Sequence, residues 1–160
     1  MGEQLPTSLE QGPNQSEVTR HAVEALATEF HEDWRKTRLD ENGAYEPRVK
    51  QTADEAWVEA HGTDQVDIAN TEYADLPADW QAENKAAAEV VVGIMVESDG
   101  NVDLNNEEVR NNVGNAVHDA WLSRNEWAKD GELGVPFEQL PADEQAKDIS
   151  QVEVAQRLFS

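Results

Sequence analysis

The sequence feature that most constrains the fold is an internal duplication. The tetrapeptide HEDW (residues 31–34) precedes a copy of LPAD at residues 76–79, and HDAW (residues 118–121) precedes a second LPAD at residues 140–143. The tryptophans are 121 − 34 = 87 positions apart and the LPAD leucines 140 − 76 = 64, so the loop of the first copy is 23 residues longer. A shared order of motifs with a loop of variable length indicates two copies of one structural unit.

Each copy opens with a segment whose apolar spacing predicts a helix. Apolar side chains recur every three or four positions in residues 16–38 and again in residues 105–127. This spacing is that of one face of an amphipathic helix. Ser16 or Thr19 is suited to cap the first helix, and Asn105 the second. Each predicted helix carries its His-x-x-Trp box near its C-terminal end.

Each LPAD tetrapeptide opens a further helix, because proline suits the first helical turn. Residues 40–70 are turn-rich, with a short helical piece near residues 54–61, and no segment has a convincing strand pattern. We therefore expect a mainly α fold. The expected boundaries are a flexible N-terminal arm over residues 1–15, a first repeat over residues 16–98 and a second repeat over residues 99–160.

The charge of the chain excludes several partners. Its 34 acidic and 12 basic residues give a net charge of −22, which repels nucleic acid and acidic membranes. There is no membrane-spanning apolar run, no secretory signal and no cysteine. We expect a cytoplasmic protein without nucleic-acid or membrane partners, able to form a homo-oligomer. The acidity indicates either a solvated surface or one that occupies a basic groove of another protein.

The histidines beside carboxylates do not predict a metal site or a catalytic centre. His31 and His118 lack the i, i+4 histidine partner of a zinc-binding helix. The glycine and glutamate of residues 98–108 fall out of register for a calcium-binding loop. The sequence holds no serine elbow, phosphate loop or dinucleotide fingerprint. We therefore expect no enzyme activity, no metal and no cofactor.

The two tryptophans carry the strongest binding signal. On a helix, His31, Trp34 and Arg38 share one face. The corresponding residues of the second copy are His118, Trp121 and Asn125. Copies packed about a pseudo-twofold axis would place the indoles across a cleft suited to a flat anionic ligand, since stacking stabilises a base by about 1 to 3 kcal/mol and guanidinium groups bind phosphate. The competing interpretation makes both indoles core residues.

A local excess of positive charge follows the first tryptophan. Five basic residues lie within a 16-residue window: Arg35, Lys36, Arg38, Arg48 and Lys50. An anionic ligand would find its attraction here. The competing interpretation is surface pairing with Glu32 and Asp33 on the same helix.

Taken together, these motifs resemble the ryanodine-receptor repeat, the RyR domain. The first copy matches through HEDWRKTR, NGAYEPR and YADLPADWQAENKAAAEVVVGIM, and the second through HDAWLSRN and FEQLPADEQAKD. The resemblance covers about residues 17–160. It implies two pseudo-symmetric helical repeats packed as one unit, in which Trp34 and Trp121 flank the adenine of a nucleotide and Arg38 lies toward its phosphates.

The chain departs from this pattern at several positions. Asn125 stands where a second arginine is expected, with Arg124 beside it, and the second loop lacks a counterpart of Tyr45. The resemblance does not explain the inserted loop that carries Trp57 and His61. The candidate ligand-binding residues are Trp34, Trp121, Arg38, His31, His118, Arg35, Tyr45, Arg48, Arg124 and Asn125.

The resemblance implies a non-enzymatic module that binds a nucleotide or a nucleotide-derived signal between its repeats. A free-standing tandem without an effector domain would act by sequestration. We therefore expect a phage-encoded protein that removes a cyclic or ADP-ribose-type immune signal from the host cytoplasm. The alternative is an acidic interaction or decoy protein that docks on a basic protein surface, with tryptophans that are purely structural.

Overall fold

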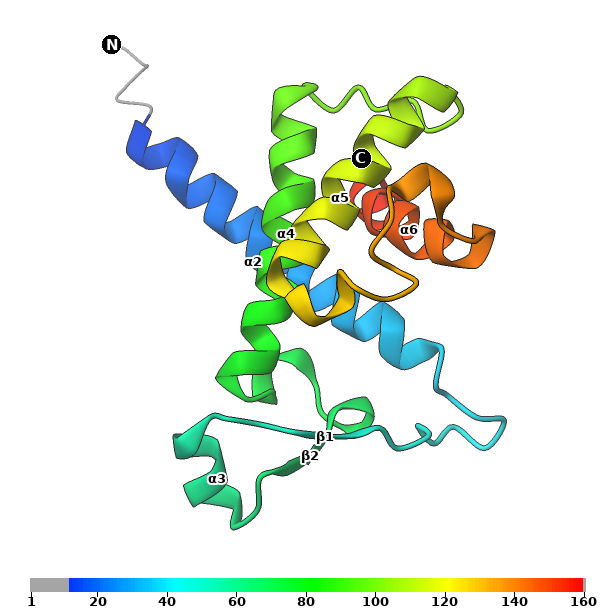
Figure 1. The fold of residues 1–160 in the computed structure, drawn as a ribbon. Coiled ribbons are helices and arrows are strands. Elements are labelled where there is room, and N and C mark those ends of the chain that lie inside the picture. Colours follow the sequence, from blue (N-terminus) through cyan, green and yellow to red (C-terminus); the bar gives the residue numbers. More distant parts are fainter. Residues whose placement is uncertain (1–11, 160) are drawn as a thin grey trace.

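Four long helices dominate the computed structural model, which describes residues 12–159 (Figure 1). They are α2 (Gly12–Lys36), α4 (Ala78–Glu97), α5 (Glu107–Arg124) and α6 (Ala142–Leu158). The predicted mainly α class is confirmed. Residues 1–11 of the predicted arm lie outside the described residues. Because α2 begins at Gly12, Ser16 and Thr19 lie within the helix and do not cap it, contrary to the prediction.

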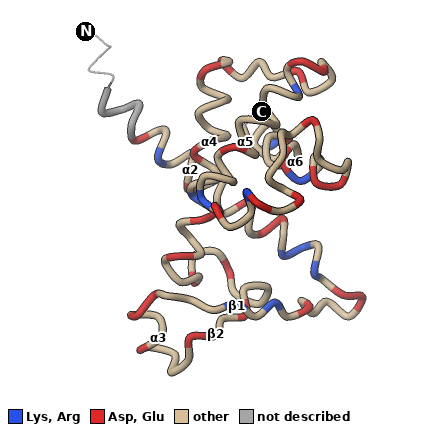
Figure 2. The backbone as a smooth tube through the Cα atoms, in the orientation of Figure 1, with Lys and Arg blue, Asp and Glu red and all other residues tan. Residues whose placement is uncertain are grey.

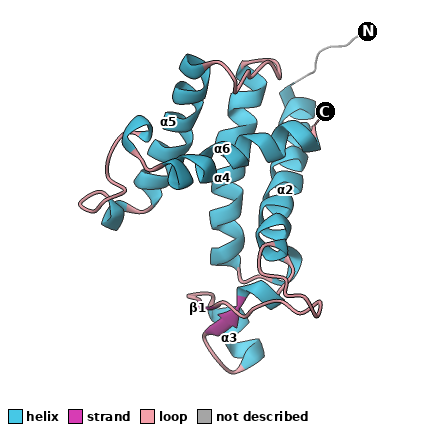
Figure 3. Ribbon diagram, turned by 90° about the vertical axis from the view of Figure 1, so that its right-hand side faces the viewer, coloured by secondary structure: helices cyan, strands magenta, loops and turns pink. Residues whose placement is uncertain are grey.

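An appended lobe, residues 37–75, separates α2 from α4 and lies beyond the ends of both helices (Figures 1 and 3). It contains strand β1 (Val49–Gln51), helix α3 (Glu55–His61), strand β2 (Gln65–Asp67) and the 3-10 turns η1 (Ile68–Asn70) and η2 (Tyr73–Asp75). The strands pair antiparallel, with Lys50 opposite Val66. The prediction of no strand was therefore wrong, because three-residue strands are too short to show a period of two.

One hydrophobic core joins all four long helices. Leu26 of α2, Val91 of α4, Val117 of α5 and Val152 of α6 belong to a single buried cluster. Helix α2 packs on α4 and α6, and α5 packs on α4 and α6. The four long helices therefore bury their apolar faces in one shared core.

The duplication extends to details outside the motifs that predicted it. In each copy the proline of LPAD caps the second helix, directly after a one-turn 3-10 helix: η2 in the first copy and η4 (Phe137–Gln139) in the second. The Nε2 atom of Gln81 donates to the carbonyl of Tyr73 at 3.0 Å, and that of Gln145 to the carbonyl of Phe137 at 3.1 Å. Both rings are buried. The arrangement as RyR repeats stays a prediction.

Helix α5 passes directly beneath the ring of Phe137. Its N-cap is Asn106, whose side chain accepts from the amide of Val109 at 3.1 Å, so the predicted cap at Asn105 is one residue early. A Cβ atom added to Gly114 would lie 2.5 Å from the Phe137 ring, which is fully buried. This glycine lets the ring rest on the helix backbone. A further 3-10 turn, η3 (Glu126–Ala128), follows α5.

Candidate binding site

His31 lies buried in α2 and holds the far end of the appended lobe. Its Nε2 atom is 2.8 Å from the carbonyl oxygen of Thr71, and because a carbonyl only accepts, Nε2 carries the hydrogen. Burial lowers the pKa of His31, which favours the neutral ring. Trp34 stacks on this imidazole with ring centroids 5.8 Å apart. The first His-x-x-Trp box thus ties the helix to the loop that it precedes.

His118 has the same role in the second copy. Its Nε2 atom lies 2.8 Å from the carbonyl of Leu133 and 2.9 Å from that of Val135, and Trp121 stacks on its ring at 6.1 Å. Its Nδ1 atom faces a carboxylate oxygen of Asp148, on α6, at 3.7 Å. Both histidines are therefore loop anchors, and each tryptophan covers one of them.

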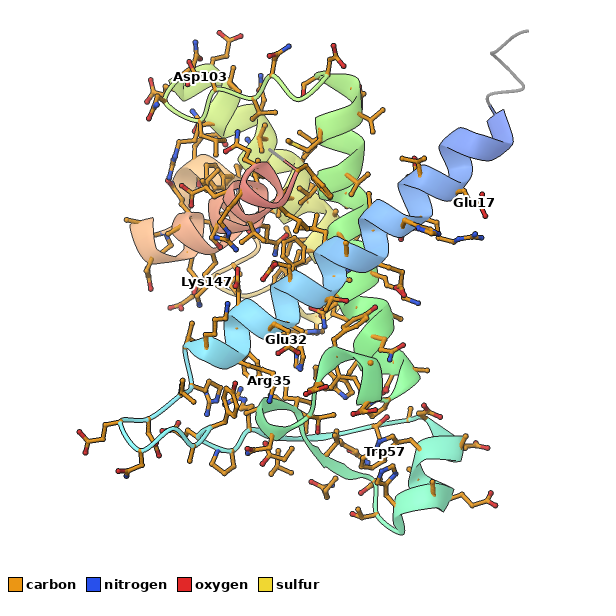
Figure 4. The ribbon with its side chains drawn as sticks, turned by 180° about the vertical axis from the view of Figure 1, so that it is seen from behind. Glu17, Glu32, Arg35, Trp57, Asp103 and Lys147 are labelled. Carbon is orange, nitrogen blue, oxygen red and sulfur yellow. The ribbon has the colours of Figure 1, made fainter. Side chains whose placement is uncertain are left out.

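The arginines expected to bind phosphate in the first copy are held by their own chain. Arg38 donates to the carbonyl and the carboxylate of Glu46, at 3.0 and 2.9 Å, while its guanidinium lies 5.4 Å from the Trp34 ring. Arg35 is buried, donates to the carbonyl of Ala69 at 2.9 Å and pairs with Glu32 (Figure 4). Both guanidinium groups stabilise the entry to the appended lobe.

The remaining predicted residues are distributed over separate parts of the surface. Tyr45 lies under the guanidinium of Arg35 at 4.3 Å, and the side chain of Arg48 is exposed without a polar partner in the described chain. Arg124 pairs with Glu83 at 3.1 Å. Asn125 donates to the Trp121 carbonyl and accepts from the indole of Trp127. Arg124 is thus paired within the chain, and its role toward a ligand stays a prediction.

Each tryptophan makes ring contacts within its own half of the chain, and the predicted pairing of Trp34 with Trp121 across a ligand stays a prediction. Among the described residues Trp34 contacts His31 and Arg38, whereas Trp121 contacts His118 and the exposed ring of Trp127. No ring contact joins Trp34 to Trp121 in that part of the chain, and neither lines the cavities described below. The sequence correctly placed both residues beside their histidines but did not identify what the histidines hold.

A polar cavity of about 600 Å³ lies between α3 and the loop through η1 and η2. Trp57 and His61 stack at 4.0 Å and line it together with Arg35. The carboxylates of Glu72 and Asp75 also line it, and they have no polar partner among the described residues. A phosphate group would meet these negative charges, so the cavity does not suit a nucleotide.

Helices α2 and α4 cross and then diverge (Figure 1). Residues of both helices line a larger and more apolar groove. We call it the α2–α4 groove. Its volume is about 1170 Å³, and its lining residues are Thr19, Arg20, Val23, Glu24, Ala82, Lys85, Glu89, Val92, Gly93, Val96 and Glu97. Unlike Gly114, Gly93 has nothing within 4 Å of an added Cβ atom. This groove was not predicted from the sequence, although a glycine inside an alanine-rich helix indicated an open helix face.

The described residues contain no group of three or more histidine, cysteine, aspartate or glutamate side chains placed to hold a metal ion. Over residues 12–159, no helix combines the length and the apolar character that crossing a membrane requires. Comparison of the chain with protein-family models, with curated proteins and with solved structures finds no match.

Proposed function

We propose that this protein is a non-enzymatic, acidic interaction module that docks on a positively charged partner protein, with Trp34 and Trp121 as structural residues. The observation that carries the proposal is that almost all lysine and arginine side chains are already engaged by partners within the chain. All 12 lie in the described region, and of these only Arg48 and Lys50 lack an ion pair, hydrogen bond or cation–π partner there.

The negative charge, by contrast, is largely unneutralised. The chain has 34 carboxylate side chains against 12 cations, and acidic residues are spread along all four long helices and the appended lobe (Figure 2). Such a surface attracts a basic protein at long range and repels phosphate. Arg35, Arg38 and Arg124 are each engaged by the chain itself, so a nucleotide would have to displace an existing ion pair.

The nucleotide interpretation stays a prediction, and one assay separates it from the proposal. We expect adenine mononucleotides, adenosine triphosphate and ADP-ribose to leave both the tryptophan fluorescence and the melting temperature unchanged. A ligand that binds the native state at 100 times its Kd would stabilise it by about 2.7 kcal/mol, which such a measurement detects readily. We expect a basic amphipathic peptide to bind with an affinity that falls steeply between roughly 50 and 300 mM salt.

The opposite pattern would replace the proposal by the nucleotide interpretation. In that case a nucleotide would raise the melting temperature and quench the fluorescence. Both effects would be lost in Trp34→Ala and Trp121→Ala and weakened in Arg38→Ala. Since Trp34 and Trp121 cover buried histidines, each variant needs a circular dichroism spectrum to show that it remains folded.

A further inference from the structure

Among the described residues, the apolar lining of the α2–α4 groove stays partly exposed. Val23 and Val92 lie at its base, 8% and 4% exposed, while Val96 on its edge is 67% exposed. A second hollow of about 580 Å³, which Phe159 also lines, borders the same Val92 and Val96. Apolar surface thus continues from one hollow to the next around the C-terminal half of α4.

The groove has the length of a helix-binding site. Its α4 side runs from Ala82 to Glu97, and 1.5 Å per residue makes this span about 23 Å. Gly93 lies within this span with open space above it. Glycine inside a helix costs roughly 0.5 to 1 kcal/mol relative to alanine, and no contact within the described chain requires this one. Because glycine has no Cβ atom, the backbone of a second helix can approach α4 closely at this position.

The charges that line the groove select a basic occupant. Lys85 pairs with Glu24 at 3.3 Å, and Arg20 pairs at 3.6 Å with Glu17, which lies on the same stretch of α2 (Figure 4). Among the described residues, Glu89 and Glu97 have no ion-pair partner. The charges left without a partner in the groove are therefore carboxylates. A second copy of a chain with net charge −22 would be repelled from this surface.

We propose that the α2–α4 groove binds a basic amphipathic helix of a partner protein. The apolar face of that helix packs on Val23, Val92 and Val96, its backbone passes over Gly93, and its lysine or arginine side chains reach Glu89 and Glu97. This is the helix-in-groove mode of peptide recognition. The inference rests on the proposed function, since it names the site and the kind of partner through which the acidic module acts.

The test titrates the full-length protein with a fluorescent, helical peptide of leucine and lysine, about 18 residues long to match the groove. A scrambled peptide of the same composition and charge, without an apolar face, is its control. Gly93→Leu places a bulky side chain where the peptide backbone would pass, and we expect this steric block to weaken binding about tenfold or more. Its melting temperature should equal or exceed that of the wild type, because leucine is the better helix former.

A matched pair of charge variants separates the groove from the overall field. The double variant Glu89→Gln/Glu97→Gln and the control Glu41→Gln/Glu59→Gln in the appended lobe remove the same charge. We expect the first to weaken binding about fivefold or more at low salt and the control to change it less than about twofold.

Each other outcome overturns the inference in a recognisable way. Equal binding of both peptides, or binding unaffected by Gly93→Leu, would remove the groove as the site and leave the proposed function standing. If neither peptide binds, the proposed function itself is wrong. A wild-type dimer in sedimentation experiments that Gly93→Leu converts to a monomer would make a second copy the occupant. Tighter binding after deletion of residues 1–11 would make that segment the occupant.

Discussion

Gly114→Ala is expected to destabilise the protein by about 2 to 3 kcal/mol, even though alanine favours a helix over glycine by about 1 kcal/mol. The added Cβ would lie 2.5 Å from the ring of Phe137, a distance that no relaxed contact allows. That ring is fully buried in a cluster with Leu140 and Ile149, so it has no free space into which to move. The steric cost therefore exceeds the gain in helix propensity.

Thermal unfolding followed by circular dichroism would measure this effect. For a chain of this size a loss of 2 to 3 kcal/mol lowers the melting temperature by roughly 4 to 12 °C. Gly93→Ala is the matched control, because its Cβ meets nothing, and we expect it to gain about 0.5 to 1 kcal/mol. A double-mutant cycle with Phe137→Leu should show positive coupling between the two sites. Equal melting temperatures for Gly114→Ala and the wild type would contradict the tight contact.

Asp148→Asn is expected to stabilise the protein at neutral pH and to leave it unchanged near pH 4. Burial raises the pKa of Asp148 from 3.8 to about 6, and the nearby ring of His118 only partly opposes this shift. Because the pKa of Asp148 is higher in the folded state than in the unfolded state, its protonated carboxyl contributes fully to the free energy of unfolding below pH 3.8. This contribution is lost as the pH rises through about 6. At 1.36 kcal/mol per pKa unit, the ionised carboxylate costs about 3 kcal/mol at pH 7.

The measurement is the free energy of unfolding by urea from pH 4 to pH 7.5, compared between Asp148→Asn and the wild type. The difference between the two curves should grow with pH and level off above pH 6. Because many other carboxylates titrate in both proteins, only this difference reports on Asp148. The structure offers an internal precedent, since the first copy has Asn84 at the corresponding position. Parallel curves over the whole range would contradict the assignment.

The sequence predicted the elements whose pattern is long and local. The four long helices follow from apolar spacing and from the prolines of LPAD, and α3 was also found. The strands were missed because each has three residues, and Val49, which begins β1, is 55% exposed. The start of α2 was placed too late because residues 12–15 show no apolar pattern.

The candidate site could be predicted only in part, because its partners are distant in sequence. The periodicity of α2 places His31 beside Trp34, but nothing local indicates that His31 binds the carbonyl of Thr71, 40 residues away. In the same way Arg38 was expected to face a ligand, and its bond to Glu46 arises from the turn between them. By contrast, the pairs of Arg35 with Glu32 and of Lys36 with Asp33 lie within α2 and agree with the surface pairing that the sequence offered.

The two histidine anchors also define where this architecture tolerates change. Thr71 and Val135 each lie five residues before the leucine of their LPAD, and each is held by the histidine of its own copy. The loop between each histidine and the carbonyl that it binds can therefore vary in length, since loop closure costs only about 0.6 kcal/mol per doubling of length. The appended lobe is thus an insertion at a position where the loop length can change. The bundle therefore depends on the two histidine–carbonyl contacts rather than on the length of the loop that each contact closes.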